Sequence, residues 1–130
     1  MNLTITGFTA AALAILLALL ALDTIRHRFR TRIPFGVGED RGLTSASRAH
    51  GNLAENAPIA LILIGLLESG GADRQILGYA AGAFVAARVL HAMGLYMQSG
   101  GPPPAPRAIG VVATLLIQLG LAGWLISRLI

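Results

Sequence analysis

Long apolar stretches alternate with short polar ones along this chain. Residues 3–22 carry no charged side chain, and neither do residues 108–127. Each stretch is long enough, as a helix, to cross a hydrocarbon core of about 30 Å. Two further apolar stretches lie between them, and segments rich in glycine and proline separate all four. The pattern predicts an all-α membrane protein whose single domain covers residues 1–130, with helices at about 3–32, 44–68, 74–98 and 107–128.

A polar stripe precedes the apolar half of the second expected helix. Arg48, Asn52 and Glu55 are spaced i, i+4 and i+7, so they share one helical face. Thr44 or Ser45 is expected to cap this helix, and Pro58 is expected to kink it beside Glu55. A carboxylate carried into a membrane is costly, and such groups mark either function or a buried ion pair.

The third and fourth expected helices carry polar residues near the same end. Arg88 and His91 lie three residues apart and therefore share a face, and Arg88 lies about 15 Å from the end of the third helix. That depth is similar to the depth of Glu55. Arg107 opens the fourth helix, and Gly78 and Gly82 in the third have a spacing that permits close helix contact. We therefore expect one polar cluster at one end of the bundle.

Composition narrows the chemistry. The chain is 55% hydrophobic and only 12% charged, which excludes an ordinary soluble domain of this size. It has no cysteine, so a substrate must supply any reactive thiol. All ten basic side chains are arginine, which forks bidentately onto carboxylates. Codon usage in a GC-rich genome explains the missing lysines equally well.

The charge distribution predicts the topology. Residues 26–48 hold six arginines against two acids, which accounts for the whole net charge of +4. By the positive-inside tendency this segment is cytoplasmic, with both termini outside a bacterial inner membrane. The basic run follows the first apolar stretch, which favours a spanning helix over a signal peptide. A topology determinant and a binding role are equally compatible with the run from Arg26 to Arg32. Few aromatics accompany it, which argues against nucleic acid.

Two motifs together resemble the MAPEG family, the membrane-associated proteins of eicosanoid and glutathione metabolism, and especially its short bacterial members. They are Arg-Ala-His-Gly-Asn-Leu-Ala-Glu-Asn-Ala-Pro at 48–58 and Arg88-Val-Leu-His91. Arg107-Ala-Ile-Gly110 extends the likeness. The resemblance implies a left-handed four-helix bundle that assembles as a homotrimer. It also implies glutathione bound at the cytoplasmic side between subunits, as the co-substrate of a transferase or peroxidase acting on lipophilic electrophiles.

The resemblance also assigns roles by position. Arg48, Asn52 and Glu55 would hold the charged ends of glutathione. Arg107 would stabilise the thiolate. Arg88 and His91 of the third helix would belong to the same pocket. Arg26 would reach across from a neighbouring subunit. Glutathione carries two carboxylates and one ammonium, so such a site needs several arginines and an acid. Its thiol, with a pKa of about 8.5, needs a nearby cation to ionise at neutral pH.

The chain departs from the family pattern at three places. Asn56 stands where tyrosine often follows the glutamate, and Leu95 replaces a tyrosine one turn past His91, with Tyr96 displaced by one. The loop containing residues 102–106 is longer and richer in proline. These differences affect close contacts to a thiol more than recognition of charge.

Other interpretations remain open at this point. Glu55 and Arg88 could form a structural ion pair between the second and third helices. The chain could be a small four-span exporter using Glu55 as a proton-coupled cation site, or a non-catalytic membrane scaffold. The arginines around Glu55 argue against cation binding. His50 and His91 have no cysteine or third histidine beside them, so no metal site is expected.

Overall fold

The computed structural model describes residues 2–130 and confirms the predicted all-α, four-helix architecture. Its helices are α1 Thr4–Thr31, α2 Arg41–Ser69, α3 Arg74–Tyr96 and α4 Ala105–Leu129. Each is long and apolar enough to cross a membrane. The described part of the chain contains no strand.

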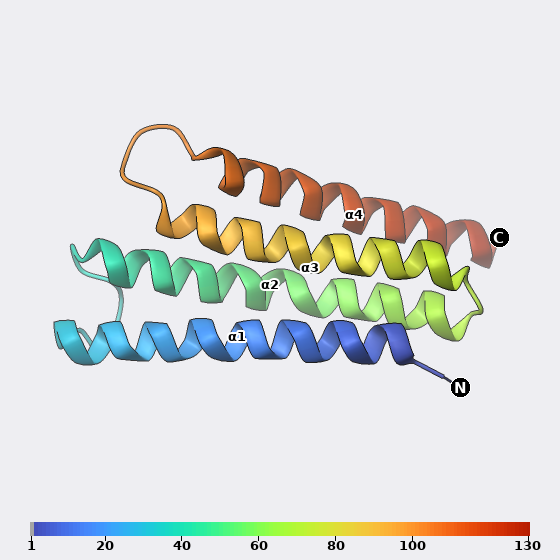
Figure 1. Cartoon of the computed structure of the whole chain (residues 1–130), viewed down its shortest axis with the longest axis horizontal. Coiled ribbons are helices and arrows are strands. Elements are labelled where there is room, and N and C mark those ends of the chain that lie inside the picture. Colours follow the sequence, from blue (N-terminus) through green and yellow to red (C-terminus); the bar gives the residue numbers. More distant parts are fainter. Residues whose placement is uncertain (1) are drawn as a thin grey trace.

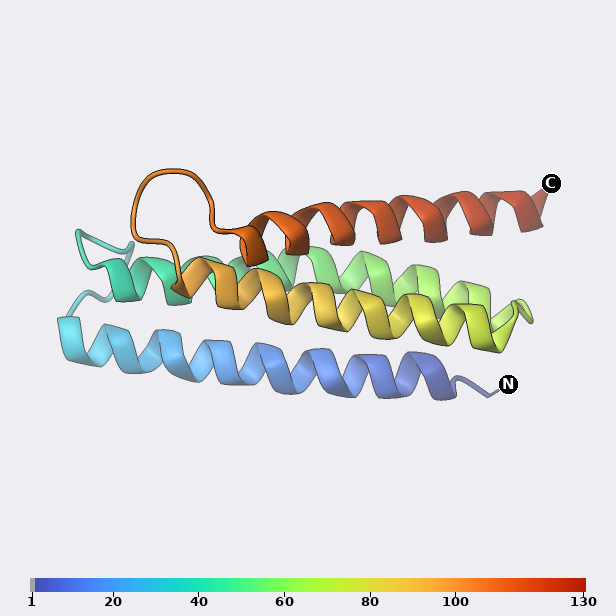
Figure 2. The same cartoon turned by 45° about the horizontal axis from the view of Figure 1, so that its top comes forward.

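The helices run up and down along one another (Figure 1). α1 and α4 lie on opposite sides of the α2–α3 pair (Figure 2), and within residues 2–130 they do not touch each other. Both termini lie at one end of the bundle, and the α1–α2 and α3–α4 loops lie at the other. The two loops that flank most of the arginines therefore share one end.

Three helix boundaries differ from those predicted by two residues or more. α2 begins at Arg41 because Asp40, and not Thr44 or Ser45, is its N-cap, with the Leu43 amide donating to the Asp40 carboxylate at 2.6 Å. The Thr44 hydroxyl donates instead to the Asp40 carbonyl oxygen, at 2.8 Å. α3 ends two residues earlier than predicted. α4 begins two residues earlier, since a proline fits the first turn of a helix, where no amide partner is needed.

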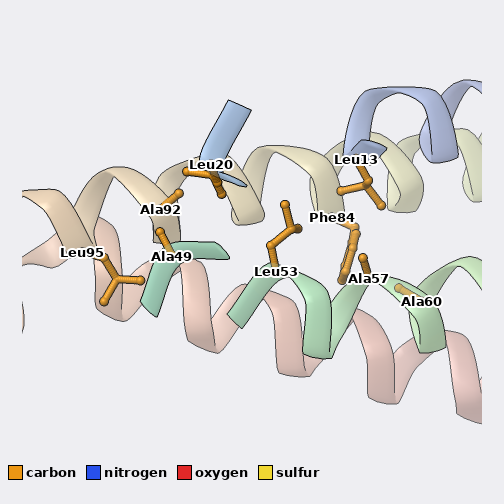
Figure 3. Close-up of a cluster of buried hydrophobic side chains, with 9 residues drawn as sticks. All are labelled: Leu13, Leu20, Ala49, Leu53, Ala57, Ala60, Phe84, Ala92 and Leu95. Atoms are coloured by element: carbon orange, nitrogen blue, oxygen red, sulfur yellow. The ribbon is translucent and has the colours of Figure 1, made fainter. Parts of the chain in front are cut away.

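The core between α1, α2 and α3 combines alanines with larger apolar side chains (Figure 3). Its buried members are Leu13, Leu20, Ala49, Leu53, Ala57, Ala60, Phe84, Ala92 and Leu95. Alanines let neighbouring backbones approach closely. Close packing of this kind holds helices together in a bilayer, where apolar lipid leaves no hydrophobic driving force between helices. A second cluster towards the termini includes Leu77 and Leu121 and joins α4 to the bundle.

Close contact between α3 and α4 depends on glycines other than the predicted pair. A Cβ added at Gly78 or Gly82 would meet nothing within 4 Å, so within this chain their spacing serves no helix contact. A Cβ at Gly94 would collide with the backbone of Arg107, and one at Gly110 would lie 2.7 Å from the Cβ of His91. These two glycines set how near α3 and α4 come at the loop end of the bundle.

Glu68 ties α2 to the start of α1 at the opposite end. Its side chain is only 1% exposed and accepts hydrogen bonds from the amides of Ile5 and Thr6, at 2.9 and 2.8 Å. The Thr6 hydroxyl donates to it as well, and the Arg74 guanidinium lies 3.7 Å away. α1 has no side-chain cap of its own, so the Glu68 carboxylate satisfies amides that the helix leaves free.

Candidate functional site

A pocket of about 370 Å³ opens between α2, α3 and α4 at the loop end of the bundle. Its lining consists of Ser47, Arg48, Gly51, Asn52, Glu55, His91, Leu95, Arg107 and Val111. Most of the predicted site residues therefore meet around one hollow. A neighbouring hollow of similar volume, lined mainly by the start of α2 and by the α3–α4 loop, shares Arg48, Leu95 and Arg107 with it.

The α2 wall of the pocket is the predicted polar stripe. Arg48 and Glu55 are exposed and Asn52 is half-buried, so all three line the hollow from one helical face. The wall offers a guanidinium and a carboxylate about 10 Å apart along the helix axis, with an amide between them. It can therefore receive a ligand that carries charges of both signs.

The opposite wall is formed by His91 of α3 and Arg107 of α4. The Nδ1 atom of His91 lies 3.3 Å from the carbonyl oxygen of Arg107. A carbonyl can only accept, so Nδ1 carries the proton and Nε2 of the neutral ring remains an acceptor. The close approach at Gly94 and Gly110 makes this contact possible.

The Arg107 guanidinium is held from the α3–α4 loop. It donates to the Oε1 atom of Gln98 at 3.1 Å, and the amide nitrogen of Gln98 donates to the Gly101 carbonyl at 3.2 Å. Arg107 lies in the first turn of α4, where the helix dipole favours a negative ligand. Sequence reasoning gave Gln98 no role, and Gln98 lies just beyond the end of α3, so its place beside Arg107 depends on the loop and not on helical spacing.

Arg88 lies behind the pocket wall. It is 3% exposed, donates from Nη1 to the Oδ1 atom of Asn52 at 2.7 Å, and donates from Nη2 to the Gly110 carbonyl at 3.1 Å. Within residues 2–130 it forms no ion pair, so the suggested Glu55–Arg88 pair is wrong. The physical reason is position, since the half-buried Asn52 is hydrogen-bonded to Arg88 while Glu55 is exposed. Arg88 thus turns the amide oxygen of Asn52 inwards.

A smaller cavity of about 150 Å³ continues from the pocket towards the middle of the bundle. It shares Asn52 and Val111 with the pocket and includes Arg88 and Asn56 in its lining. The Asn56 amide, which stands where the family often has tyrosine, donates to the Asn52 carbonyl at 2.8 Å. Its own carbonyl accepts from the side chain of Gln118 of α4 at 3.1 Å, so Asn56 serves helix contacts here.

Arg26 is not brought to the pocket. It is exposed on α1, which lies on the far side of the α2–α3 pair from α4. Within one chain it cannot reach the hollow, so its role in a neighbouring subunit's site stays a prediction.

Four apolar helices, with a pocket lined by arginine, histidine and glutamate at one end, define an integral membrane protein. The model of the MAPEG family matches residues 6–127. The chain therefore belongs to the MAPEG family, as its motifs predicted.

Similarity to individual proteins points the same way. The chain is 32% identical over 92 residues to the inner membrane protein YecN of Escherichia coli K12, covering 71% of this chain and 70% of that protein. It is equally similar to the protein of the same name in Escherichia coli O6:H1. The name of these relatives gives a location and no activity.

Proposed function

We propose that this protein is a membrane-bound, glutathione-dependent transferase or peroxidase acting on lipophilic electrophiles. Membership of the MAPEG family supports a glutathione- or eicosanoid-related protein at family level. The observation that carries the finer proposal is the convergence of two guanidinium groups and one carboxylate, Arg48, Arg107 and Glu55, on a single pocket.

The charges of the pocket complement those of glutathione. The volume of the pocket, about 370 Å³, falls in the range of small-ligand sites. Glu55 would receive the single ammonium group, while Arg48 and the amide nitrogen of Asn52 would bind a carboxylate. Nε2 of His91 would accept from a peptide N–H of the ligand.

Arg107 would then lie beside the sulfur. A fixed guanidinium at the start of a helix stabilises the thiolate over the thiol and so lowers the pKa of the bound group. In the transferase reaction the thiolate forms a carbon–sulfur bond and the electrophile releases its leaving group or takes up a proton. In the peroxidase reaction two glutathione molecules reduce a hydroperoxide to an alcohol and water, and become one disulfide.

A place for the lipophilic partner adjoins the same arginine. A hollow of about 340 Å³ lies against the outer side of α4 and shares Arg107 and Val111 with the pocket. Its other lining residues include Pro103, Ala108 and the exposed Val112. An apolar substrate arriving from the bilayer would therefore reach the sulfur without crossing water.

The assembly and location belong to the same proposal. We place the protein in the inner membrane, following the name of its relatives. The pocket would face the cytoplasm and the termini the outside, because the arginine-rich loop segments share the pocket end. A homotrimer would bring Arg26 of a neighbouring subunit to the pocket.

Calorimetric titration of reduced glutathione into the detergent-solubilised protein tests the proposal. Glu55→Gln should weaken binding about tenfold or more, because a hydrogen bond to a charged group contributes about 1.5–3 kcal/mol. Glu39→Gln, which makes the same charge change in the exposed α1–α2 loop, is the matched control and should bind as the wild type does. Absence of binding to the wild type would refute the proposal, and equal affinity of both variants would remove Glu55 from the site.

A further inference from the structure

A separate hollow lies on the outward face of α1, away from the candidate site. It has a volume of about 440 Å³ and is lined by Ile25, Arg28, Phe29, Arg32 and Pro34, which we call the α1 groove. Residues 25, 28 and 29 are spaced i, i+3 and i+4, so they form one stripe on α1, and Arg32, the residue that ends the helix, follows this stripe. That stripe faces away from α2, because His27 and Arg30 are the residues that approach Gly42 at the start of α2.

The groove is a built feature and not a bare helix face. Arg32 adopts a left-handed conformation, with φ of 56°, which ends α1 and turns the chain back over the stripe. Nη1 of Arg28 then fastens the returning segment, because the carbonyl oxygens of Ile33, Pro34 and Gly36 lie 3.0–3.1 Å from it. The result is an apolar floor with one guanidinium fixed at its edge and a second, that of Arg32, exposed beside it.

The position of the groove along α1 matches the headgroup layer of a bilayer. α1 has 28 residues and is therefore about 42 Å long, against a hydrocarbon core of about 30 Å. Its uncharged residues fill the core up to Leu22, so the stripe from Ile25 to Arg32 lies within and just beyond the headgroups. Phe29 is 83% exposed there, so its apolar ring is free to lie against lipid.

We propose that the α1 groove binds an anionic phospholipid. Its phosphate would lie between Arg28 and Arg32, since arginine forks onto phosphate oxygens. The first part of an acyl chain would lie along Ile25 and Phe29. Charge complementarity favours an anionic lipid over a zwitterionic one, whose own cation would meet two guanidinium groups.

The chain supplies its own control for this proposal. Arg30 stands in the same basic run, but its guanidinium lies 3.1 Å from the Asp40 carboxylate and faces the start of α2. Removing the charge of Arg30 or of Arg32 changes the net charge of the segment equally. Only the second change touches the α1 groove.

Native mass spectrometry of the delipidated, detergent-solubilised protein tests the proposal. The wild type should retain dioleoyl phosphatidylglycerol in preference to dioleoyl phosphatidylcholine. Arg32→Gln should weaken retention of phosphatidylglycerol about fivefold, the effect of one basic side chain beside an anionic lipid. Arg32→Lys should keep most of the affinity, and Arg30→Gln should keep nearly all of it. Thermal unfolding of each variant shows that it is folded.

Four results would overturn the proposal. Equal retention of the two lipids would mean that charge is not recognised. Equal losses of phosphatidylglycerol retention in Arg30→Gln and Arg32→Gln would mean that the total charge of the basic run attracts the lipid, without a defined binding groove. Full displacement of the lipid by inorganic phosphate would mark a simple anion site. A change of oligomeric state in Arg32→Gln, with no lipid bound to the wild type, would show that a second copy of the chain covers the groove.

Discussion

Replacing Gly110 with alanine should disturb the pocket without changing any residue that lines it. A Cβ at Gly110 would lie 2.7 Å from both the amide nitrogen and the Cβ of His91, and 2.8 Å from the Ala87 carbonyl oxygen. Ordinary van der Waals contact begins at 3.4 Å, so α3 and α4 must separate by about 0.7 Å or more. Two of the three atoms belong to the helix backbone, which cannot rotate away.

The expected cost follows from that geometry. Forcing additional atoms into a packed contact costs about 1–3 kcal/mol in folding free energy. The separation also pulls the Arg107 carbonyl away from the Nδ1 atom of His91, and the Gly110 carbonyl away from Arg88. Gly110→Ala should therefore lower both the midpoint of thermal unfolding and the affinity for glutathione.

Gly120→Ala is the matched control. Gly120 lies on the same helix, and a Cβ there would meet nothing within 4 Å. The substitution should be neutral or slightly stabilising, since alanine is favoured over glycine within a helix by about 1 kcal/mol. Both variants would be compared by thermal unfolding in detergent and by titration with glutathione. If Gly110→Ala matched Gly120→Ala in both, close approach of α3 and α4 would not be what shapes the pocket.

Three further changes test other parts of the structure. Arg88→Met should lower the folding stability by about 1–3 kcal/mol and weaken glutathione binding, because the amide of Asn52 loses its buried partner. Thermal unfolding would measure the first effect and titration with glutathione the second. Glu68→Gln should cost about 1.5–3 kcal/mol of stability at the opposite end of the bundle and leave glutathione affinity unchanged in the same two assays. The Leu43 amide holds the pKa of the Asp40 carboxyl below its ordinary value of 3.8. The ionised carboxylate therefore stabilises the folded state above a pH of about 3.8, and this stabilisation is lost as the pH falls through the lowered pKa. As the pH is lowered through the acidic range, the midpoint of thermal unfolding should therefore fall less in Asp40→Asn than in the wild type.

Helix number and the convergence of polar stripes could be predicted because both depend on periodicity. Twenty-residue runs without charge leave little alternative to spanning helices. Arg48, Asn52 and Glu55 share a face by spacing alone, and the up-and-down order of four spans brings His91 and Arg107 to the same end. These residues meet around one pocket, while their roles towards glutathione stay predictions.

Which side chains contact one another across helices could not be predicted, because these contacts depend on the angles between helices, which residue spacing does not give. Glu55 and Arg88 have opposite charges and similar depth, yet Arg88 is hydrogen-bonded to Asn52. Glu68 is the last residue of the predicted second helix, and nothing in its position along the chain indicates that it caps α1 from across the bundle. Gly78 and Gly82 had the spacing of a helix contact, but Gly94 and Gly110 make that contact, because only the packed structure shows which glycine faces a neighbour.

The thiolate absorbance of bound glutathione, measured against pH, tests the proposed chemistry most directly. A free thiol, with a pKa of about 8.5, is mostly protonated at neutral pH. If Arg107 stabilises the thiolate, glutathione bound to the wild type should instead be ionised at neutral pH. Arg107→Ala should raise the pKa of the bound thiol, with a smaller effect on affinity, and Arg107→Lys should restore part of the shift. Arg48→Ala should weaken binding and leave the pKa of the bound thiol nearly unchanged. Wild-type protein that binds glutathione but shows no thiolate at neutral pH would contradict the proposed transferase or peroxidase activity.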